Sequence, residues 1–552
     1  MIKTCRSCDL KFEITPADRD FYAKIDVPEP GNCPRCRLIR RLQERNTRRL
    51  YYRKCDYSGE KIISQFHENL PFPVYKPDTW WSDKWDPLQY GRDFNFRRSF
   101  FDQFRELKQK VPHQGLYVIS GTMENSDYTN CTGYLKNCYL IFESDYDEDC
   151  YYSNLLKNSR DLMDCSVCYD CERCYECIDC IDCYNLKYAQ DCRNCQDSYF
   201  LKDCSGCKNC IGCINQKHKE FMVFNKQYTR EHYEKMKRNF GLDSLQNVEK
   251  LRKKVEEFFI TQFRRPLEEE NNQNCVGDHL YNSKNSFECY DSKDLEDCKY
   301  CVKVSLGVKS AMDYNSWGDK AELVYETASS GDNIYNVKFC TTCTSHVSNC
   351  EYCYGCARCS DLFGCVSVKD KKYCILNKQY SQEDYLKLKG KIIAHMKKTG
   401  EYGEFFPNDL CPFGYNETIA MAYFPMNREE ALKKGYGWVE KEPVVKRHEP
   451  VDKGPDKIGD AKDNIVRQIL SCKTCGSYYR IILHELKFYR NMHIPVPDMC
   501  PDCRYEARMR MRPSLKLWDR KCDKCGSDMK SSFSPERPET IYCRSCYLKE
   551  VY

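Results

Sequence analysis

Cysteine occurs at every third position in one stretch of this chain, and pairs of cysteines twelve residues apart lie on both sides of it. A chain that returns to the same residue type every twelve residues stacks like side chains about 4.8 Å apart, which is the arrangement of a β-solenoid. We therefore expect small stacked coils whose narrow core is filled by cysteine. The stretch contains Cys165, Cys168, Cys171, Cys174, Cys177, Cys180 and Cys183, and the pairs are Cys138 and Cys150, Cys192 and Cys204, and Cys195 and Cys207.

The 42 cysteines among 552 residues also bear on the compartment. In a secreted protein they would indicate disulfides, but the stretch from Met1 to Cys8 lacks the apolar run of a signal peptide, and no stretch has the length and apolar character of a membrane helix. We expect a soluble, cytoplasmic protein of several domains, whose reduced cysteines are zinc ligands or small buried apolar side chains.

The N-terminal module carries two CxxC pairs, Cys5 with Cys8 and Cys33 with Cys36. Each pair forms a tight knuckle that presents two thiolates, so two pairs at this separation predict a tetrahedral Cys₄ zinc site. The alternative, two unrelated pairs of buried cysteines, is disfavoured because so short a segment holds little core without a metal.

The C-terminal module repeats this pattern at a constant offset of 467 residues and adds a second site. The positions in the N-terminal copy that correspond to this second site are Cys55, Ser58, Lys76 and Thr79, so three of four ligands are missing there. We therefore predict three zinc ions per chain and a metal-free Cys55. The C-terminal ligands are Cys472, Cys475, Cys500 and Cys503 for the repeated site, and Cys522, Cys525, Cys543 and Cys546 for the added site.

These residues carry a resemblance to a known group of proteins. The CxxC pair followed by Phe12-Glu-Ile-Thr15, Phe21-Tyr22 and Cys33-Pro-x-Cys36-Arg37 resembles the zinc-ribbon domains, of treble-clef character, in uncharacterised bacterial proteins where such ribbons flank a cysteine-rich repeat region. The stretch from Trp80 to Asp93 belongs to the same likeness, which covers most of the chain. The resemblance implies zinc binding and no particular activity, and the missing ligands depart from its usual pattern.

An arginine-rich stretch follows the first metal site in each module. Arginine beside zinc knuckles suits phosphate backbones through charge and bidentate hydrogen bonding, and the alternative is a solvated helical face. Because the net charge of the chain is only +5, such a surface would be local, and nothing distinguishes RNA from DNA. The candidate residues are Arg37, Arg40, Arg41, Arg45, Arg48 and Arg49, and Arg504, Arg508, Arg510 and Arg512.

The middle of the chain is duplicated, because Gly212 to Tyr228 matches Gly364 to Tyr380 at a constant offset of 152. We predict a multidomain, mainly β chain with two cysteine-rich β-solenoid segments, helical insertions and flanking Cys₄ zinc modules. The predicted segments are a zinc module (1–60), an aromatic connector that caps the first solenoid (61–112), solenoid repeat 1 (113–228), a helical insertion (229–272), solenoid repeat 2 (273–380), a helical and mixed segment (381–446), a flexible linker (447–465) and a two-site zinc module (466–552).

Two further patterns concern the repeat regions. Acids stand directly before many cysteines, among them Asp164, Asp182 and Asp203, and we expect them on a solvated outer edge rather than around divalent cations. In the second repeat, aliphatic residues replace cysteines, which predicts that the cysteines are core residues and not metal ligands. The replacements are Ala311, Leu323, Val324 and Ala328.

No phosphate loop, dinucleotide fingerprint or serine-type triad occurs in the sequence. The favoured hypothesis is a non-enzymatic zinc-binding scaffold or adaptor that binds nucleic acid, a ribonucleoprotein or a protein partner on the solenoid surface, with no membrane role. A thiolate metal store is the alternative, because soft ions bind runs of CxxC. A CxxC thiol redox protein is the third, although no pair stands in a thioredoxin-like context.

Overall fold

The computed structural model describes residues 1–318, 321–440 and 453–551, and the chain divides into two compact units. Unit 1 joins the N-terminal Cys₄ module and the connector to the second repeat region, and unit 2 joins the first repeat region to the C-terminal Cys₄ module. Neither unit is continuous in sequence. Unit 1 is Met1–Leu116, Leu267–Glu440 and Leu515–Leu517, and unit 2 is Tyr117–Pro266, Lys441–Ser514 and Trp518–Tyr552.

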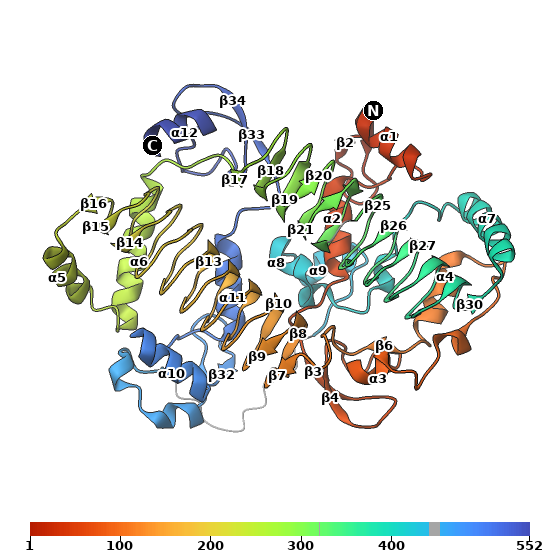
Figure 1. Ribbon diagram of the computed structural model, residues 1–552, viewed down its shortest axis with the longest axis horizontal. Helices are drawn as coiled ribbons and strands as arrows, with labels where there is room; N and C mark the ends of the chain where they lie inside the picture. The colour runs from red at the N-terminus through yellow and green to blue at the C-terminus, as the bar shows by residue number, and fades with distance from the viewer. Residues whose placement is uncertain (319–320, 441–452, 552) are drawn as a thin grey trace. The chain divides into compact units, whose positions relative to one another are not determined.

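In unit 2 the first repeat region forms a stack of short parallel strands (Figure 1). Each strand pairs with the strand twelve residues later, so that Asn154 lies beside Ser166 and Ser166 beside Ile178. Isolated parallel bridges continue the same spacing, as between Gln190 and Lys202. The twelve-residue spacing of the cysteines is therefore the register of the backbone pairing. The strands are β8 (Thr129–Gly133), β10 (Ile141–Asp145), β11 (Asn154–Lys157), β12 (Ser166–Tyr169) and β13 (Ile178–Ile181), followed by β14 (Lys208–Ile211) and β15 (Glu220–Val223).

Every third residue of this stack is buried in a narrow core. Cys165, Cys168 and Cys174 are 0% exposed, and leucine takes equivalent positions at Leu162 and Leu186. The thiols also donate weak hydrogen bonds inward, because Cys165 Sγ lies 3.4 Å from the carbonyl oxygens of both Met163 and Cys174. Cysteine thus combines a small apolar volume with a donor for backbone carbonyls that line the core.

The residue before each core position has a positive φ, which explains the acids that precede the cysteines. Asp164, Asp170 and Asp182 have φ values of 56°, 54° and 52°. Aspartate and asparagine tolerate this left-handed region better than other residues with a β-carbon. They also bond from coil to coil, as where Asn185 Nδ2 donates to Asp197 Oδ1 over 2.7 Å. The acids that we expected on a solvated edge therefore occur at these positions first of all because they tolerate a positive φ.

In unit 1 the second repeat region forms a similar stack with a variable coil length. Ser348 pairs with Ser360 twelve residues later, whereas Val302 pairs with Asn315 and Tyr335 with Ser348 at a spacing of thirteen. The extra residue accounts for the irregular middle of this repeat. The strands are β18 (Val276–Tyr281), β19 (Phe287–Lys293), β21 (Val302–Ser305), β24 (Asn315–Gly318), β26 (Tyr335–Lys338), β27 (Ser348–Glu351), β28 (Ser360–Phe363) and β29 (Lys372–Ile375).

Three of the four predicted cysteine replacements are buried, namely Ala311, Val324 and Ala328. The prediction for Leu323 is wrong, because this residue is half-buried and has a φ of 53°. It occupies the left-handed position before the core residue Val324. Each thirteen-residue coil shifts the following core positions by one residue. The twelve-residue spacing of the first repeat therefore assigns Leu323 to a core position that it does not occupy.

Each stack ends in an antiparallel hairpin and a capping helix. In unit 2, β15 pairs with β16 (Lys226–Gln227), and α5 (Arg230–Phe240) follows with Thr229 as its N-cap. In unit 1, β29 pairs with β30 (Lys378–Gln379), and α7 (Gln382–Thr399) follows with Ser381 as its N-cap. The duplication predicted at an offset of 152 therefore includes the cap. A further helix, α6 (Leu245–Ile260), lies along the first stack (Figure 1).

The aromatic connector packs against the second stack, so the prediction that it caps the first is wrong. Its helix α4 (Phe100–Lys108) places the Phe100 ring 5.2 Å from that of Tyr352 and 5.5 Å from that of Phe363. The connector follows the N-terminal module into unit 1, although the first repeat is its neighbour in sequence.

The expectation of a mainly β chain is corrected as well, because helix accounts for 25% and strand for 27%. The strands of the two stacks are short, from two to seven residues, and many coils contribute only isolated bridges. Part of the predicted linker, 447–452, lies outside the described residues. The rest carries buried side chains, including Ile458 and Ile465. In the described part of the chain, no helix combines the length and the apolar character that a bilayer crossing requires.

Candidate metal centres

The four predicted ligands of the N-terminal module converge. Sulfur atoms of Cys5, Cys8, Cys33 and Cys36 all lie within 4.8 Å of one another, and Cys8 Sγ is 3.8 Å from Cys33 Sγ. The first pair follows β1 (Ile2–Thr4), and the second opens helix α2 (Pro34–Gln43). The knuckle turns at Asp9, whose φ is 59°.

The C-terminal module contains two such tetrads. In the first, Cys475 Sγ lies 3.8 Å from Cys500 Sγ, and in the second, Cys525 Sγ lies 3.7 Å from Cys543 Sγ. All twelve predicted metal ligands are therefore brought together in three groups of four. The tetrads are Cys472, Cys475, Cys500 and Cys503, and Cys522, Cys525, Cys543 and Cys546.

These tetrads fit a zinc ion on two grounds. Four sulfurs at a Zn–S distance of about 2.3 Å form a tetrahedron with edges of about 3.8 Å, which is the separation seen here. Backbone N–H groups also point at the sulfurs, because the amide of Cys33 lies 3.2 Å from Cys5 Sγ and that of Cys500 lies 3.2 Å from Cys472 Sγ. Such donors stabilise thiolates and orient them toward one point.

The charge of the tetrad leads to the same conclusion. The hydrogen bond from Cys36 lowers the pKa of the Cys33 thiol to about 5, while the pKa of Cys36 is raised because it shares that bond. One thiolate is thus stable at neutral pH, but four in contact repel one another unless a cation neutralises them. A soft divalent ion would supply that charge, and all-sulfur tetrahedral sites are typical of zinc.

The N-terminal copy keeps the shape of a fourth site but has only one of its four ligands, Cys55. Gly59 has a φ of 73°, and the amide of Lys76 lies 3.4 Å from Cys55 Sγ, as the amide of Cys543 lies 3.1 Å from Cys522 Sγ. The Asp56 carboxylate accepts a hydrogen bond from the amide of Val74, and Asp523 accepts the equivalent bond. Hydrogen bonds therefore hold this knuckle in the N-terminal copy, where the C-terminal copy has a tetrad that could hold a metal ion.

The cysteines of the two stacks do not form groups of this kind. Among the described residues, the all-cysteine groups of three or more sulfurs close enough to share an ion are the three tetrads. Burial raises the pKa of Cys168 and Cys177 far above the usual range. The stack thiols are thus arranged as core side chains, separate from the metal centres.

The arginine-rich stretches form helices that begin at a metal ligand. Cys33 is the N-cap of α2, and Cys500 is the N-cap of α11 (Pro501–Met511). In unit 1, Arg37 Nε donates to Asp313 Oδ2 over 2.6 Å, and Arg41 approaches the same carboxylate at 3.2 Å. The residues of this ion pair are between 0% and 1% exposed.

Unit 2 repeats these contacts, with arginines at the offset of 467 and an aspartate of the first stack. Arg504 approaches Asp164 at 3.3 Å and Arg508 donates to it over 2.8 Å, again fully inside the protein. The guanidinium of Arg504 lies 4.8 Å from the ring of Tyr152, as that of Arg37 lies 5.4 Å from the ring of Tyr300. The sequence reasoning missed this role for Asp164, which is buried and ion-paired rather than solvated.

Six of the ten arginines proposed for nucleic acid are thus buried within their own unit, and the other four are not. Arg40 is partly exposed and bonds to Glu326, while Arg49 and Arg510 are exposed and Arg48 is half-buried. The six buried residues are Arg37, Arg41, Arg45, Arg504, Arg508 and Arg512. The signal that would have identified them is the shared spacing of four residues, which places Arg37 with Arg41, and Arg504 with Arg508, on one helix face.

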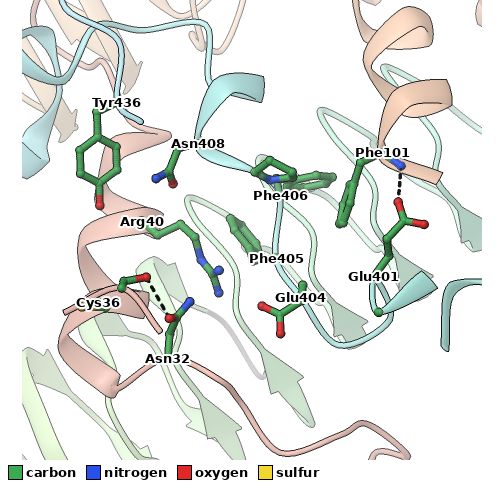
Figure 2. Close-up of a pocket in the computed structure, with 13 residues that line it drawn as sticks. Asn32, Cys36, Arg40, Phe101, Glu401, Glu404, Phe405, Phe406, Asn408 and Tyr436 are labelled. Carbon is green, nitrogen blue, oxygen red and sulfur yellow. Dashed lines mark hydrogen bonds between the residues drawn. The ribbon is translucent and has the colours of Figure 1, made fainter. Parts of the chain in front are cut away.

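A cavity of about 370 Å³ lies beside the first tetrad (Figure 2). Cys36 and Arg40 line it together with Asn32, Phe405 and Tyr436. The Arg40 guanidinium lies 5.3 Å from the centre of the Phe405 ring, and Figure 2 shows it between Asn32 and the aromatic side chains. The cavity therefore borders both the metal centre and the arginine helix of unit 1.

Comparison with known proteins adds little to this geometry. No protein-family model matches the chain, and no curated protein does. Among solved structures, one described as an acetyltransferase from Desulfovibrio desulfuricans G20 is 9% identical, with 45% of this chain and 75% of that chain covered and a TM-score of 0.11.

Proposed function

We propose that this chain is a non-enzymatic, zinc-binding scaffold whose two stacks are β-solenoids that present outer surfaces to a macromolecular partner. The observation that carries the proposal is the convergence of twelve cysteines into three tetrads with the separations of a zinc site. Zinc in such closed sites contributes folding energy instead of chemistry, because no position is left for a substrate.

The burial of the remaining thiols supports a structural role over thiol chemistry. A reactive cysteine needs exposure and a lowered pKa, whereas all stack cysteines except the half-buried Cys131 and Cys275 are buried, and many have a raised pKa. Nucleic acid is one candidate partner. Because six arginines are buried, we expect binding of RNA or DNA, if it occurs, to depend on the exposed Arg510 more than on Arg504 or Arg508.

The proposal is tested by elemental analysis of protein purified under reducing conditions, together with free-thiol counts before and after denaturation. We expect three zinc ions per chain, a loss of one ion in a Cys525→Ser variant, and slow labelling of the stack thiols until the protein is denatured. Six or more soft ions per chain, lost together with the fold on chelation, would reject the scaffold in favour of a metal store.

A further inference from the structure

The same set of contacts fixes each zinc module on its stack. In both units, three left-handed positions on successive coils carry tyrosine, aspartate and glutamate, and the aspartate binds two arginines of the module helix. We call Asp164 and Asp313 the docking acids, and α2 and α11 the docking helices. The successive positions are Tyr152, Asp164 and Glu176 in unit 2, and Tyr300, Asp313 and Glu326 in unit 1.

Each docking helix is also part of a metal centre. In α11, the N-cap Cys500 and the first-turn residue Cys503 are two ligands of the tetrad, and Arg504 and Arg508 follow on the next residue and one turn later. In α2, Cys33 and Cys36 stand in the same relation to Arg37 and Arg41. The metal would therefore fix the first turn of the helix that carries the buried arginines.

The buried arginines tolerate little displacement. Arg504 is 1% and Asp164 0% exposed, and no water replaces a lost partner at such a site without opening the interface. An unpaired charge is costly in the interior, so a small shift of the helix favours complete release over partial contact. The position of the docking helix and the pairing of its arginines with the docking acid are therefore coupled.

We propose that zinc in the first tetrad of each module acts as a latch, which holds the docking helix against the docking acid and releases it when the ion is lost. This inference rests on the zinc occupancy proposed above. It adds that zinc in the first tetrad of each module controls a specific interface within its unit. Zinc in the third tetrad does not control such an interface. That tetrad joins α12 (Arg544–Val551), which contacts the stack through Tyr547 and Asn215 instead of arginine and aspartate.

The latch is tested by hydrogen exchange of the full chain with Cys475→Ser, a change at an exposed ligand of unit 2. We expect one zinc ion fewer, and amides of α11 that exchange at least tenfold faster, while those of α2 keep their protection as an internal reference. Cys525→Ser is the matched control, since it removes one ion from the third tetrad and should leave α11 protected.

The two parts of the proposal fail in different ways. An unchanged zinc content in Cys475→Ser would contradict metal binding at that tetrad. A loss of one ion with wild-type protection of α11 would overturn the latch alone.

A second comparison decides the case in which Cys475→Ser unfolds throughout, which fast exchange of α2 would reveal. Coupling is reciprocal, so a weakened dock must weaken zinc binding by the same factor, typically about 5- to 150-fold. Arg508→Gln should therefore lose the ion of its tetrad at lower chelator concentration. Arg510→Gln changes an exposed residue of the same helix and should behave as wild type. Equal zinc retention by the two variants would overturn the latch.

Discussion

At the scale of single residues, the stacks are specified as much by their left-handed positions as by their cysteines. The aspartate before a cysteine supplies a positive φ at the corner, and the cysteine supplies the core. A β-branched residue is strained in that conformation, whereas glycine adopts it freely. The recurring Asp-Cys pair thus favours, through local sequence alone, a bend of the backbone at every third residue.

This role is testable at Asp182, an exposed residue with a φ of 52°. Replacement by valine should lower the free energy of unfolding by about 1–2 kcal/mol, because the left-handed conformation is costly for L-residues with a branched side chain. Replacement by glycine should be neutral or slightly stabilising. Chemical unfolding of the three proteins measures the difference, and equal stabilities of the valine and glycine variants would contradict the assignment.

A buried carboxyl at a core position gives a second prediction. Burial raises the pKa of Asp147 from 3.8 to about 8, so the folded state keeps a proton that the unfolded chain loses. The stability from this group is complete below the unfolded pKa and falls by about 1.4 kcal/mol per pH unit as the pH rises toward 8. Asp147→Asn does not titrate, and its hydrogen bond from the amide of Ser159 can remain.

We therefore expect the Asp147→Asn variant to melt above the wild type at pH 8 and to approach it at pH 5. Thermal midpoints of both proteins at each pH provide the measurement. A constant offset between the two curves would show that Asp147 does not bind a proton on folding.

At the scale of elements, the sequence predicted the metal centres because their ligands come in local pairs. The CxxC pairs identified all three tetrads, and the offset of 467 showed which ligands of a fourth are missing. The docks could not be predicted in this way, because Arg37 and Asp313 are 276 residues apart and only tertiary packing joins them. The thirteen-residue coils and the place of Leu323 were missed for a related reason, since a repeat read in one copy does not report insertions in the other.

The knuckle around Cys55, which has one of the four ligand positions filled by cysteine, offers a prediction about these elements. Because its turn and its amide donors are already in place, we expect the triple variant Ser58→Cys, Lys76→Cys, Thr79→Cys to bind a fourth ion. Elemental analysis should give one more zinc per chain than the wild type. A variant with the single change Ser58→Cys is the control, and its metal content should remain at the wild-type value.

At the scale of the whole molecule, sequence order and structural grouping differ. Each unit takes a Cys₄ module from one end of the chain and a stack from the opposite half. The order of segments along the chain could be predicted from the sequence, but which module packs on which stack could not. Both modules carry the same arginine pair, and both stacks carry an equivalent aspartate.

Separate halves of the chain, 1–266 and 267–552, should therefore fold poorly alone and associate when they are expressed together. Each unit draws residues from both halves, so the complex should contain one copy of each and three zinc ions. Affinity purification of one tagged half tests this. A stable, monomeric 1–266 with its own module docked on its own stack would contradict the pairing.

The sequence separation of the docking residues also determines how long one partner waits for the other during translation. Translation adds about 5–20 residues per second. The ribosome needs roughly 14–55 s to travel the 276 residues from Arg37 to Asp313 and roughly 17–69 s for the 344 residues from Asp164 to Arg508. During the first interval a nascent chain carries an arginine helix without its carboxylate, and during the second it carries a carboxylate without its arginines. The docking interfaces therefore remain incomplete during most of translation. Chaperones that bind exposed surface have time to act on the nascent chain in this period.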